Sequence, residues 1–254
     1  VYDIGATGST LQNLPAGTTV YIAGGAYVKG LIKTTATTGT TTVRGRGILS
    51  GIDVPRIDGL WDHFMVDGGV TAPLKVEGIV STDAPQPHLA SYSTGGSHFD
   101  NVKLLSWNLM TDAFDHWQNI LVTNCFIKVN DDAIKPGNAN SVYRDNVVWL
   151  QTCGSAVQLG WIQTPDKPGT NILVDGVDII GSDVATASDI GPGENDSIIS
   201  FRNANGAGYS NDTIQNVRSD VRVYDVFGFH IKDTLPGFNQ GLGYIDGMTF
   251  KNFD

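Results

Sequence analysis

The stretches Phe99-Asp-Asn101, Leu121-Val-Thr-Asn124 and Tyr143-Arg-Asp-Asn146 each end a short strand-like run on asparagine, at steps of 23 and 22 residues. Related stretches that end on glycine or asparagine recur on both sides, namely Tyr21-Ile-Ala-Gly24, Thr42-Val-Arg-Gly45, Lys75-Val-Glu-Gly78, Leu173-Val-Asp-Gly176, Thr213-Ile-Gln-Asn216 and Tyr244-Ile-Asp-Gly247. A repeat of this length is typical of one coil of a parallel β-helix with three short strands. The longer steps between some of these stretches indicate coils with inserted loops.

The composition agrees with a solenoid of short strands. Charged residues make up only 17% of the 254-residue chain, whereas long helices favour Glu and Lys. An antiparallel β-sandwich also has many short strands, but the Asn-Gly and Asp-Gly pairs do not fall at the alternating junctions that its hairpins need. We therefore predict an all-β fold, a right-handed parallel β-helix that forms one domain over residues 1–254. We also expect that coils are missing at one or both ends.

Charge and cysteine content narrow the partners and the compartment. A net charge of −10 disfavours nucleic acid and acidic polysaccharides and favours a neutral or cationic partner. Cys125 and Cys153 are too few for a disulfide framework, and we expect two free, buried thiols unless compartment and geometry allow a disulfide. No run of about 18 apolar residues predicts a membrane span. We expect a secreted monomer without a membrane partner, although no signal peptide is visible.

Three aspartates fall at similar offsets in neighbouring coils. Asp112 lies eleven residues after Asn101, and Asp131 and Asp132 lie seven and eight residues after Asn124. These offsets place all three side chains on one side of adjacent coils if the first coil carries a few extra residues. A bend or bulge would be needed to aim the two consecutive aspartates outward together.

Such a cluster suits glycoside hydrolysis. One carboxylic acid protonates the leaving oxygen and another carboxylate activates water, and inverting enzymes hold the two groups about 6.5–9.5 Å apart, a range that neighbouring coils can reach. Close like charges raise the pKa of one member, which supplies the acid. The alternatives from the residues alone are an ordinary turn for Asp112, and a capped corner or a calcium site for Asp131 and Asp132.

The same residues resemble a known family. Met110-Thr-Asp-Ala, followed 19 positions later by the aspartate pair of Val129-Asn-Asp-Asp-Ala-Ile-Lys135, is similar to glycoside hydrolase family 49, the dextranases and isopullulanases. Val157-Gln-Leu-Gly-Trp161 also follows the pattern of that family, as do Val20–Gly30 and Gly45–Gly51. The resemblance implies a β-helix that cleaves a neutral α-glucan internally and with inversion, most often at the α-1,6 bonds of dextran. It implies Asp131 as general acid, with Asp112 and Asp132 holding the water.

The related polygalacturonases of family 28 fit the sequence less well. They carry Gly-His-Gly and Arg-Ile-Lys motifs for acidic sugars, whereas this chain has Gly154-Ser-Ala and Phe229-His-Ile-Lys232. The chain also departs from family 49, because it has no room for the β-sandwich that precedes the helix in that family. Substrate specificity is therefore expected to follow the neutral-glucan pattern, with the isopullulanase type and the polygalacturonase-like hydrolase as alternatives.

Further residues are expected to bind substrate around the aspartates. Sugar rings stack on aromatic faces, so we expect Trp117 and Trp161 in the groove, and we expect Trp149 to be structural. Lys135 and Gln158 are predicted to bind sugar hydroxyls, and Lys135 also to tune the aspartate pKa values. The remaining candidates for the groove are Asp115 and His116.

Two other function classes stay open from the sequence. A carbohydrate-binding β-helix without catalysis would keep the aromatic residues but would not need the aspartates. A calcium-dependent lyase would act on acidic sugars, which an acidic protein repels. Neither a metal nor a cofactor is expected for the hydrolase.

Overall fold

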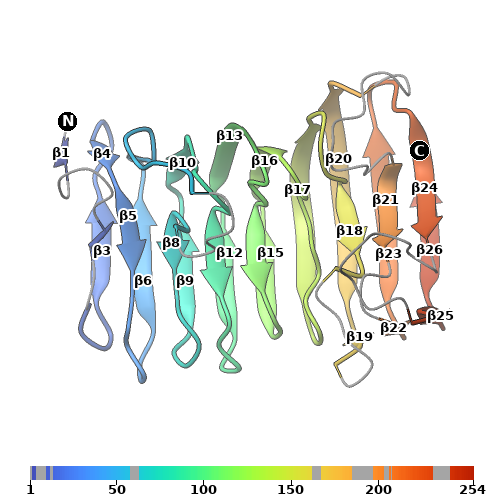
Figure 1. Cartoon of the computed structure of the whole chain (residues 1–254), viewed down its shortest axis with the longest axis horizontal. Coiled ribbons are helices and arrows are strands. Elements are labelled where there is room, and N and C mark those ends of the chain that lie inside the picture. Colours follow the sequence, from blue (N-terminus) through green and yellow to red (C-terminus); the bar gives the residue numbers. More distant parts are fainter. Residues whose placement is uncertain are drawn as a thin grey trace.

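The described part of the chain forms one stack of coils whose regular elements are all β-strands (Figure 1). The computed structural model describes residues 2–3, 10–11, 14–57, 63–161, 167–184, 197–202, 206, 208–230 and 241–254. Every strand pair within these residues is parallel, and successive coils lie side by side along the long axis (Figure 1). The predicted right-handed parallel β-helix is confirmed. None of the described segments is a helix that could cross a membrane.

The largest sheet has 15 strands in two arms that meet at the long strand β17 (Val142–Leu150). The first arm consists of β1 (Tyr2–Asp3), β4 (Tyr27–Lys29), β7 (Ile48–Ser50), β10 (Val80–Thr82), β13 (Lys103–Leu109) and β16 (Phe126–Asn130). The second arm consists of β3 (Thr19–Ile22), β6 (Thr41–Gly45), β9 (Leu74–Glu77), β12 (Ser97–Asp100) and β15 (Ile120–Thr123). The sheet continues from β17 through β20 (Leu173–Ser182), β23 (Thr213–Ser219) and β26 (Thr249–Phe253).

Three smaller sheets close the coils. One contains β2 (Thr10–Leu11), β5 (Leu31–Lys33), β8 (Val66–Asp67), β11 (Leu89–Ser91) and β14 (Phe114–His116). Another contains β18 (Val157–Leu159), β21 (Ser197–Arg202) and β24 (Asp225–His230). The third contains β19 (Gly169–Thr170), β22 (Gly208–Ser210) and β25 (Tyr244–Asp246).

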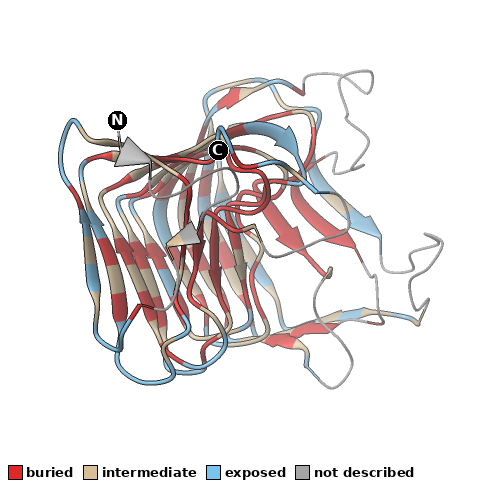
Figure 2. Ribbon diagram, turned by 60° about the vertical axis from the view of Figure 1, so that its left-hand side comes forward, coloured by how far each residue is buried: buried red, intermediate tan, exposed pale blue. Residues whose placement is uncertain are grey.

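The core is a set of apolar rows that run along the stack. Val43, Val76, Phe99, Val122 and Tyr143 pair in register from coil to coil, and each of them is fully buried. Neighbouring positions along β9, β12 and β15 alternate between buried and accessible, as the period of a strand requires (Figure 2). Cys125 and Cys153 are both buried and free, so the predicted thiols are confirmed.

The asparagine repeat marks a corner of the coil. Asn101, Asn124 and Asn216 have φ between 54° and 57°, the left-handed conformation that asparagine tolerates better than other residues with a side chain. The alignment of Asn146 with Asn124 is wrong by one residue, because Asp145 has the left-handed backbone and Asn146 is buried, with its Oδ1 accepting from the N–H of Cys125.

Two further features of the corners differ from the expected repeat. Asn252, and not Gly247, continues the corner of Asn216, to which its side chain donates a 2.8 Å hydrogen bond. Gly247 instead follows β25, in a different sheet. A ladder, which the sequence did not suggest, joins Asn119, Asn140 and Asn171 by side-chain hydrogen bonds of 3.3–3.4 Å.

Candidate active site

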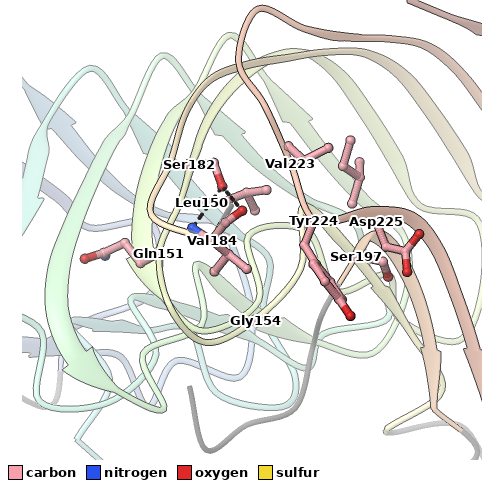
Figure 3. A pocket seen from close by; sticks show the side chains of 10 residues that line it. Leu150, Gln151, Gly154, Ser182, Val184, Ser197, Val223, Tyr224 and Asp225 are labelled. Carbon is pink, nitrogen blue, oxygen red and sulfur yellow. Dashed lines mark hydrogen bonds between the residues drawn. The ribbon is translucent and has the colours of Figure 1, made fainter. Parts of the chain in front are cut away.

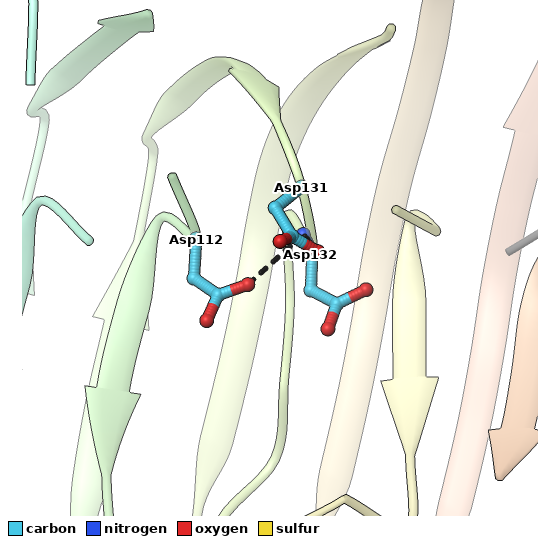
Figure 4. Close-up of side chains that lie close together, drawn as sticks. All are labelled: Asp112, Asp131 and Asp132. Atoms are coloured by element: carbon cyan, nitrogen blue, oxygen red, sulfur yellow. Dashed lines mark hydrogen bonds between the residues drawn. The ribbon is translucent and has the colours of Figure 1, made fainter. Parts of the chain in front are cut away.

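Three aspartates converge on one side of two adjacent coils. Asp112 lies between β13 and β14, and Asp131 and Asp132 directly follow β16. One carboxylate oxygen from each lies within 4.8 Å of the others (Figure 4). The structure therefore brings together the three residues that the sequence offsets singled out.

A β-bulge supplies the extra residues that this convergence requires. Leu105 pairs with Lys128 and Leu109 pairs with Asn130, so four steps along β13 correspond to two steps along β16. The two additional residues account for most of the difference between the offsets of Asp112 and Asp132. The bulge thus brings into alignment carboxylates that lie at different numbers of residues after Asn101 and Asn124.

Asp132 ties the cluster together through its backbone. Its N–H donates to Asp131 Oδ1 at 3.0 Å and to Asp112 Oδ1 at 3.2 Å (Figure 4), and its own Oδ1 accepts from the N–H of Ser155 at 3.3 Å. Asp112 and Asp132 are buried, while Asp131 is half-buried. The two consecutive aspartates lie in a bend outside any strand, as predicted, so both can reach Asp112.

Gly154 on the next coil makes room for this bend. It has φ of +88°, and a Cβ placed there would lie 2.0 Å from the carbonyl carbon of Asp131. Only glycine fits such a close approach with this backbone conformation. The glycine therefore belongs to the construction of the site although it carries no functional group.

Lys135 places a buried cation against the cluster. Its Nζ forms an ion pair with Asp112 Oδ2 and lies 4.0 Å from Asp132 Oδ2. Burial alone would lower the pKa of this ammonium, but the charges of Asp112, Asp132, Asp115 and Asp131 outweigh burial and raise it. Lys135 therefore stays charged and offsets part of the negative charge of the aspartates.

Asp131 differs from its two neighbours in its surroundings. Burial raises the pKa of its carboxyl well above the ordinary value, and the charges of Asp112 and Asp132 raise it further. The charge of Lys135 opposes this shift only in part. Among the described residues, the ion pairs of Lys135 involve Asp112 and Asp132 and not Asp131. Asp131 therefore keeps its proton more readily than an ordinary aspartate does.

The carboxylates lie closer together than expected. Their nearest oxygens fall within 4.8 Å, below the range of about 6.5–9.5 Å that inverting hydrolases show between their carboxyl groups. A water molecule that donates two hydrogen bonds of about 2.8 Å spans about 4.5 Å between its acceptors. The spacing therefore suits a single water held between two carboxylates.

The same oxygens could hold a cation, as the calcium alternative requires. The Lys135 ammonium, however, already contacts Asp112 and approaches Asp132, so a second positive charge would be repelled there. The charge of Lys135 therefore favours acid–base chemistry over a metal site.

A buried polar network supports the backbone around Asp112. The ring of His88 lies between the hydroxyls of Ser81, at 2.8 Å, and Ser106, at 3.1 Å, and Ser106 donates to Thr111 at 2.7 Å. The backbone N–H of His88 also donates to the carbonyl of Asp112 at 2.9 Å. Burial lowers the pKa of His88 to about 3, so the ring is neutral and acts as a fixed support.

Asp115 and Trp117 lie on the accessible side of β14 and its continuation. Tyr92, one coil earlier, donates to Asp115 Oδ2 at 2.7 Å, and its ring centroid lies 5.3 Å from that of Trp117. Trp117 is 43% exposed, so its indole can contact a ligand as predicted. Tyr92 was missed by sequence reasoning, although its position one coil before Trp117 is a signal that could have found it.

His116 and Gln158 do not reach the surface. His116 is fully buried, where Tyr143 Oη lies 2.6 Å from its Nε2, so its predicted contact with substrate is wrong. Burial and the charge of Lys135 lower its pKa to about 3. Gln158 is likewise fully buried in β18, with Nε2 donating to the carbonyl of Leu159 at 2.8 Å, which argues against its predicted contact with a polysaccharide.

The other two tryptophans differ in their setting. Trp161 is partly exposed just after β18, where the predicted contact with a sugar stays open. Trp149 lies under the ammonium of Lys128, 3.9 Å from its ring, and donates to Asp183 at 3.2 Å. These contacts agree with the structural role expected for Trp149.

A small cavity lies next to Gly154, among Gln151, Gly154, Ser182 and Tyr224 (Figure 3), and holds about 10 Å³. That volume corresponds to about one water molecule. The cavity is therefore too small to hold a sugar ring.

Comparison with known proteins gives weak sequence similarity to three enzymes. The chain is 26% identical to a dextranase of Arthrobacter globiformis over 165 residues, which is 56% of this chain and 26% of the dextranase. It is 24% identical to an isopullulanase of Aspergillus niger over 260 residues, which is 92% of this chain and 45% of the isopullulanase. A dextranase of Arthrobacter strain CB-8 is 24% identical over 165 residues, 56% of this chain and 26% of that dextranase. The chain thus spans less than half the length of each of these relatives.

The fold has a counterpart of known structure. The family 28 exopolygalacturonase of Yersinia enterocolitica superposes with a TM-score of 0.58 at 14% identity, over 98% of this chain and 60% of that enzyme. No protein-family profile matches the chain. Together, these similarities support the resemblance at the level of a β-helix superfamily that includes dextranases, isopullulanases and polygalacturonases, and not at the level of one family.

Proposed function

We propose that this chain is the catalytic β-helix of a glycoside hydrolase that cleaves α-glucosidic bonds within a neutral polysaccharide. The observation that carries the proposal is the division of labour among the three carboxyls. Asp131 has a raised pKa, whereas Asp112 and Asp132 face the Lys135 ammonium. Pairs of carboxyls in contrasting environments supply the acid and the base of glycosidases.

The reaction follows from the positions of these groups. Asp131 donates its proton to the glycosidic oxygen, and the bond from the anomeric carbon to that oxygen breaks. One water, held between Asp112 and Asp132, attacks the anomeric carbon and loses a proton to a carboxylate of this pair. The products are a shortened chain with a new reducing end and a second fragment whose hydroxyl carries the proton from Asp131.

A neutral substrate suits the cation at the cluster. An acidic sugar would need a cation to receive its carboxylate, but Lys135 is already paired with Asp112. The net charge of −10 adds long-range repulsion of an acidic polymer. Dextran, with its α-1,6 linkages, is our first candidate substrate because two of the sequence relatives are dextranases.

Pullulan is the second candidate substrate. The similarity to an isopullulanase covers 92% of this chain, more than the similarity to either dextranase. A polymer of this kind occurs outside the cell, so we propose that the protein is secreted. Inversion at the anomeric carbon is part of the proposal because the family resemblance implies it.

A panel of polymers tests the proposal. The protein is incubated with dextran, pullulan and polygalacturonate, and new reducing ends, ultraviolet absorbance and the first anomer formed are followed, the last by proton NMR. We expect reducing ends from dextran or pullulan, no absorbance and an inverted anomer. An unsaturated product would indicate a lyase, and a folded protein that binds the polymers without cleaving them would be a binding module.

A further inference from the structure

The bulge before Asp112 exposes an apolar surface that the reaction described above does not use. Trp107, Leu109 and Met110, which we call the β13 lip, are 58%, 38% and 40% exposed. Trp107 lies five residues before Asp112, and Trp117 lies five residues after it. Within the coil that carries Asp112, one exposed tryptophan therefore precedes this aspartate in the sequence and another follows it.

The lip has a strained backbone. Eleven residues other than glycine have a left-handed φ among the described residues, and ten of them are Asn or Asp. Met110, with φ of 61°, is the eleventh. A left-handed residue with a long side chain costs about 1–2 kcal/mol. Such strain commonly accompanies a functional site, so a ligand for the exposed surface is worth seeking.

The lip is nevertheless held firmly in place. The carbonyl of Trp107 accepts from Asn130 Nδ2 at 2.9 Å, and the side chain of Asn108 donates to the carbonyl of Ala84 at 3.3 Å. Arg56 donates to the carbonyl of Leu109. Asn130 directly precedes Asp131, so the lip is joined by one side chain to the residue proposed as general acid.

The chemistry of the lip suits the apolar face of an uncharged sugar. Its exposed side chains are an indole, an isobutyl group and a thioether, and a pyranose presents C–H groups to such surfaces. The alternation of β13 leaves Ser106 fully buried and Trp107 exposed, and the bulge breaks this alternation so that Leu109 is exposed as well. Because the β13 lip is continuous with the aspartates, we expect the polysaccharide that binds at the aspartates to cover this surface as well.

We propose that Trp107 and Met110 form a sugar subsite, separate from Trp117, that binds a ring of the polysaccharide on the Asn130 side of the cluster. This subsite rests on the proposed function for the identity of its ligand. Substrate would then contact the protein on both sides of the bond that is cleaved, which favours cleavage within a chain over release of terminal units. A short oligosaccharide would leave the subsite empty.

Binding measurements test the subsite without requiring turnover. Isomaltoheptaose and isomaltose are titrated by calorimetry into Asp131→Asn protein and into the same protein with Trp107→Ala. We expect Trp107→Ala to weaken heptaose binding about 3- to 10-fold, the range for one lost aromatic contact, and isomaltose binding to change less than twofold. The matched control is Tyr21→Ala, which removes an exposed aromatic side chain of β3 far from the cluster.

The outcomes separate the subsite from the reaction. Trp107→Phe keeps an aromatic face and should restore heptaose binding to within about twofold, whereas a loss of stability alone would not be rescued in this way. Equal affinities for the parent and the Trp107→Ala protein would overturn the subsite. Reducing-end assays of the protein with Asp131 intact test hydrolysis independently, because their failure would overturn the proposed reaction and leave the binding result standing. Failure of the parent protein to bind heptaose at all would overturn the subsite and dextran as the substrate, and the reducing-end assay on pullulan would still test hydrolysis.

Discussion

The corner at Asn124 and the bend at Asp131 lie seven residues apart in one coil, but they are built in opposite ways. At the corner, each coil contributes one left-handed residue, as at Asn101, Asn124 and Asp145, and the spacing hardly varies. At the bend, β13 contributes a bulge, the next coil contributes consecutive aspartates, and the coil after that contributes Gly154. The repeated corner fixes the distance between successive coils. At the bend, where each coil departs from the repeat in its own way, this fixed distance brings the carboxylates of neighbouring coils together.

This contrast predicts that an Asp→Asn substitution lowers activity at the bend but leaves activity unchanged at the corner. Asp132→Asn keeps the shape of the side chain but removes a charge beside Lys135, so we expect kcat on the polymer to fall about 100- to 10,000-fold. Asp145→Asn at the corner should leave kcat unchanged, because asparagine occupies the equivalent corner positions. Steady-state kinetics on both folded variants measure the difference. Similar activities of the two variants would contradict the assignment.

Replacement of glycine by alanine tests the bend by steric crowding. Gly154→Ala places a Cβ against the backbone of Asp131, whereas Gly25→Ala meets nothing within 4 Å despite a φ of +81°. Both changes carry a left-handed penalty of about 1–2 kcal/mol, and Gly154→Ala adds an overpacking cost of about 1–3 kcal/mol. Denaturant unfolding and kcat should show the larger stability loss, together with reduced activity, only for Gly154→Ala. Equal losses would mean that the bend tolerates the extra atom.

The charge of Lys135 should be visible in the pH profile. This charge lowers the pKa of Asp131, so Lys135→Gln raises that pKa further. A general acid acts only while it is protonated, and activity falls as the pH rises through its pKa. The alkaline limb of kcat/KM should therefore move to higher pH in Lys135→Gln, with a lower maximum.

Lys128→Gln provides the control for this shift. Lys128 lies over the Trp149 ring, and it does not appear among the groups that shift the pKa of Asp131. Its removal should leave the alkaline limb in place. A limb that stays in place in Lys135→Gln as well, or moves to lower pH, would rule out Asp131 as the group that titrates.

The smallest effect is expected at the corner itself. Asn124 has φ of 56°, and its side chain donates to Asp100 at 2.9 Å. Asn124→Ala should lower the free energy of unfolding by about 1–2 kcal/mol, while Asn124→Gly, which accepts this φ, should lower it by less. Activity should be unchanged in both. A stability loss with Gly as large as that with Ala would show that the hydrogen bond, and not the backbone, matters at this position.

The sequence was sufficient for the repeating part of the molecule. Strand runs that end on Asn or Gly predicted the coils, because few other residues accept a left-handed corner. The aspartate offsets predicted the convergence of Asp112, Asp131 and Asp132, subject to extra residues in the first coil. Each of these inferences depends on local conformation, which a single sequence records well.

The errors arise where the repeat breaks. Consecutive strand residues face opposite sides, so only one of Asp115 and His116 can point outward, and the irregular connection between β13 and β14 hides from the sequence which one does. The repeat predicts Asn146 at the corner because Asp145, which has the left-handed backbone there, is the less usual residue at such a position. Gln158 is enclosed by its surroundings in three dimensions, which spacing along the chain does not record.

The most direct test of the account uses Asp131→Asn with two substrates that differ in their leaving groups. Dextran needs a proton on its leaving oxygen, whereas a 4-nitrophenyl glycoside of an isomalto-oligosaccharide releases a stable phenolate. We predict that Asp131→Asn loses activity on dextran about 100- to 10,000-fold and retains most of its activity on the nitrophenyl glycoside. Equal loss on both substrates, or full activity on dextran, would contradict the assignment of Asp131 as general acid.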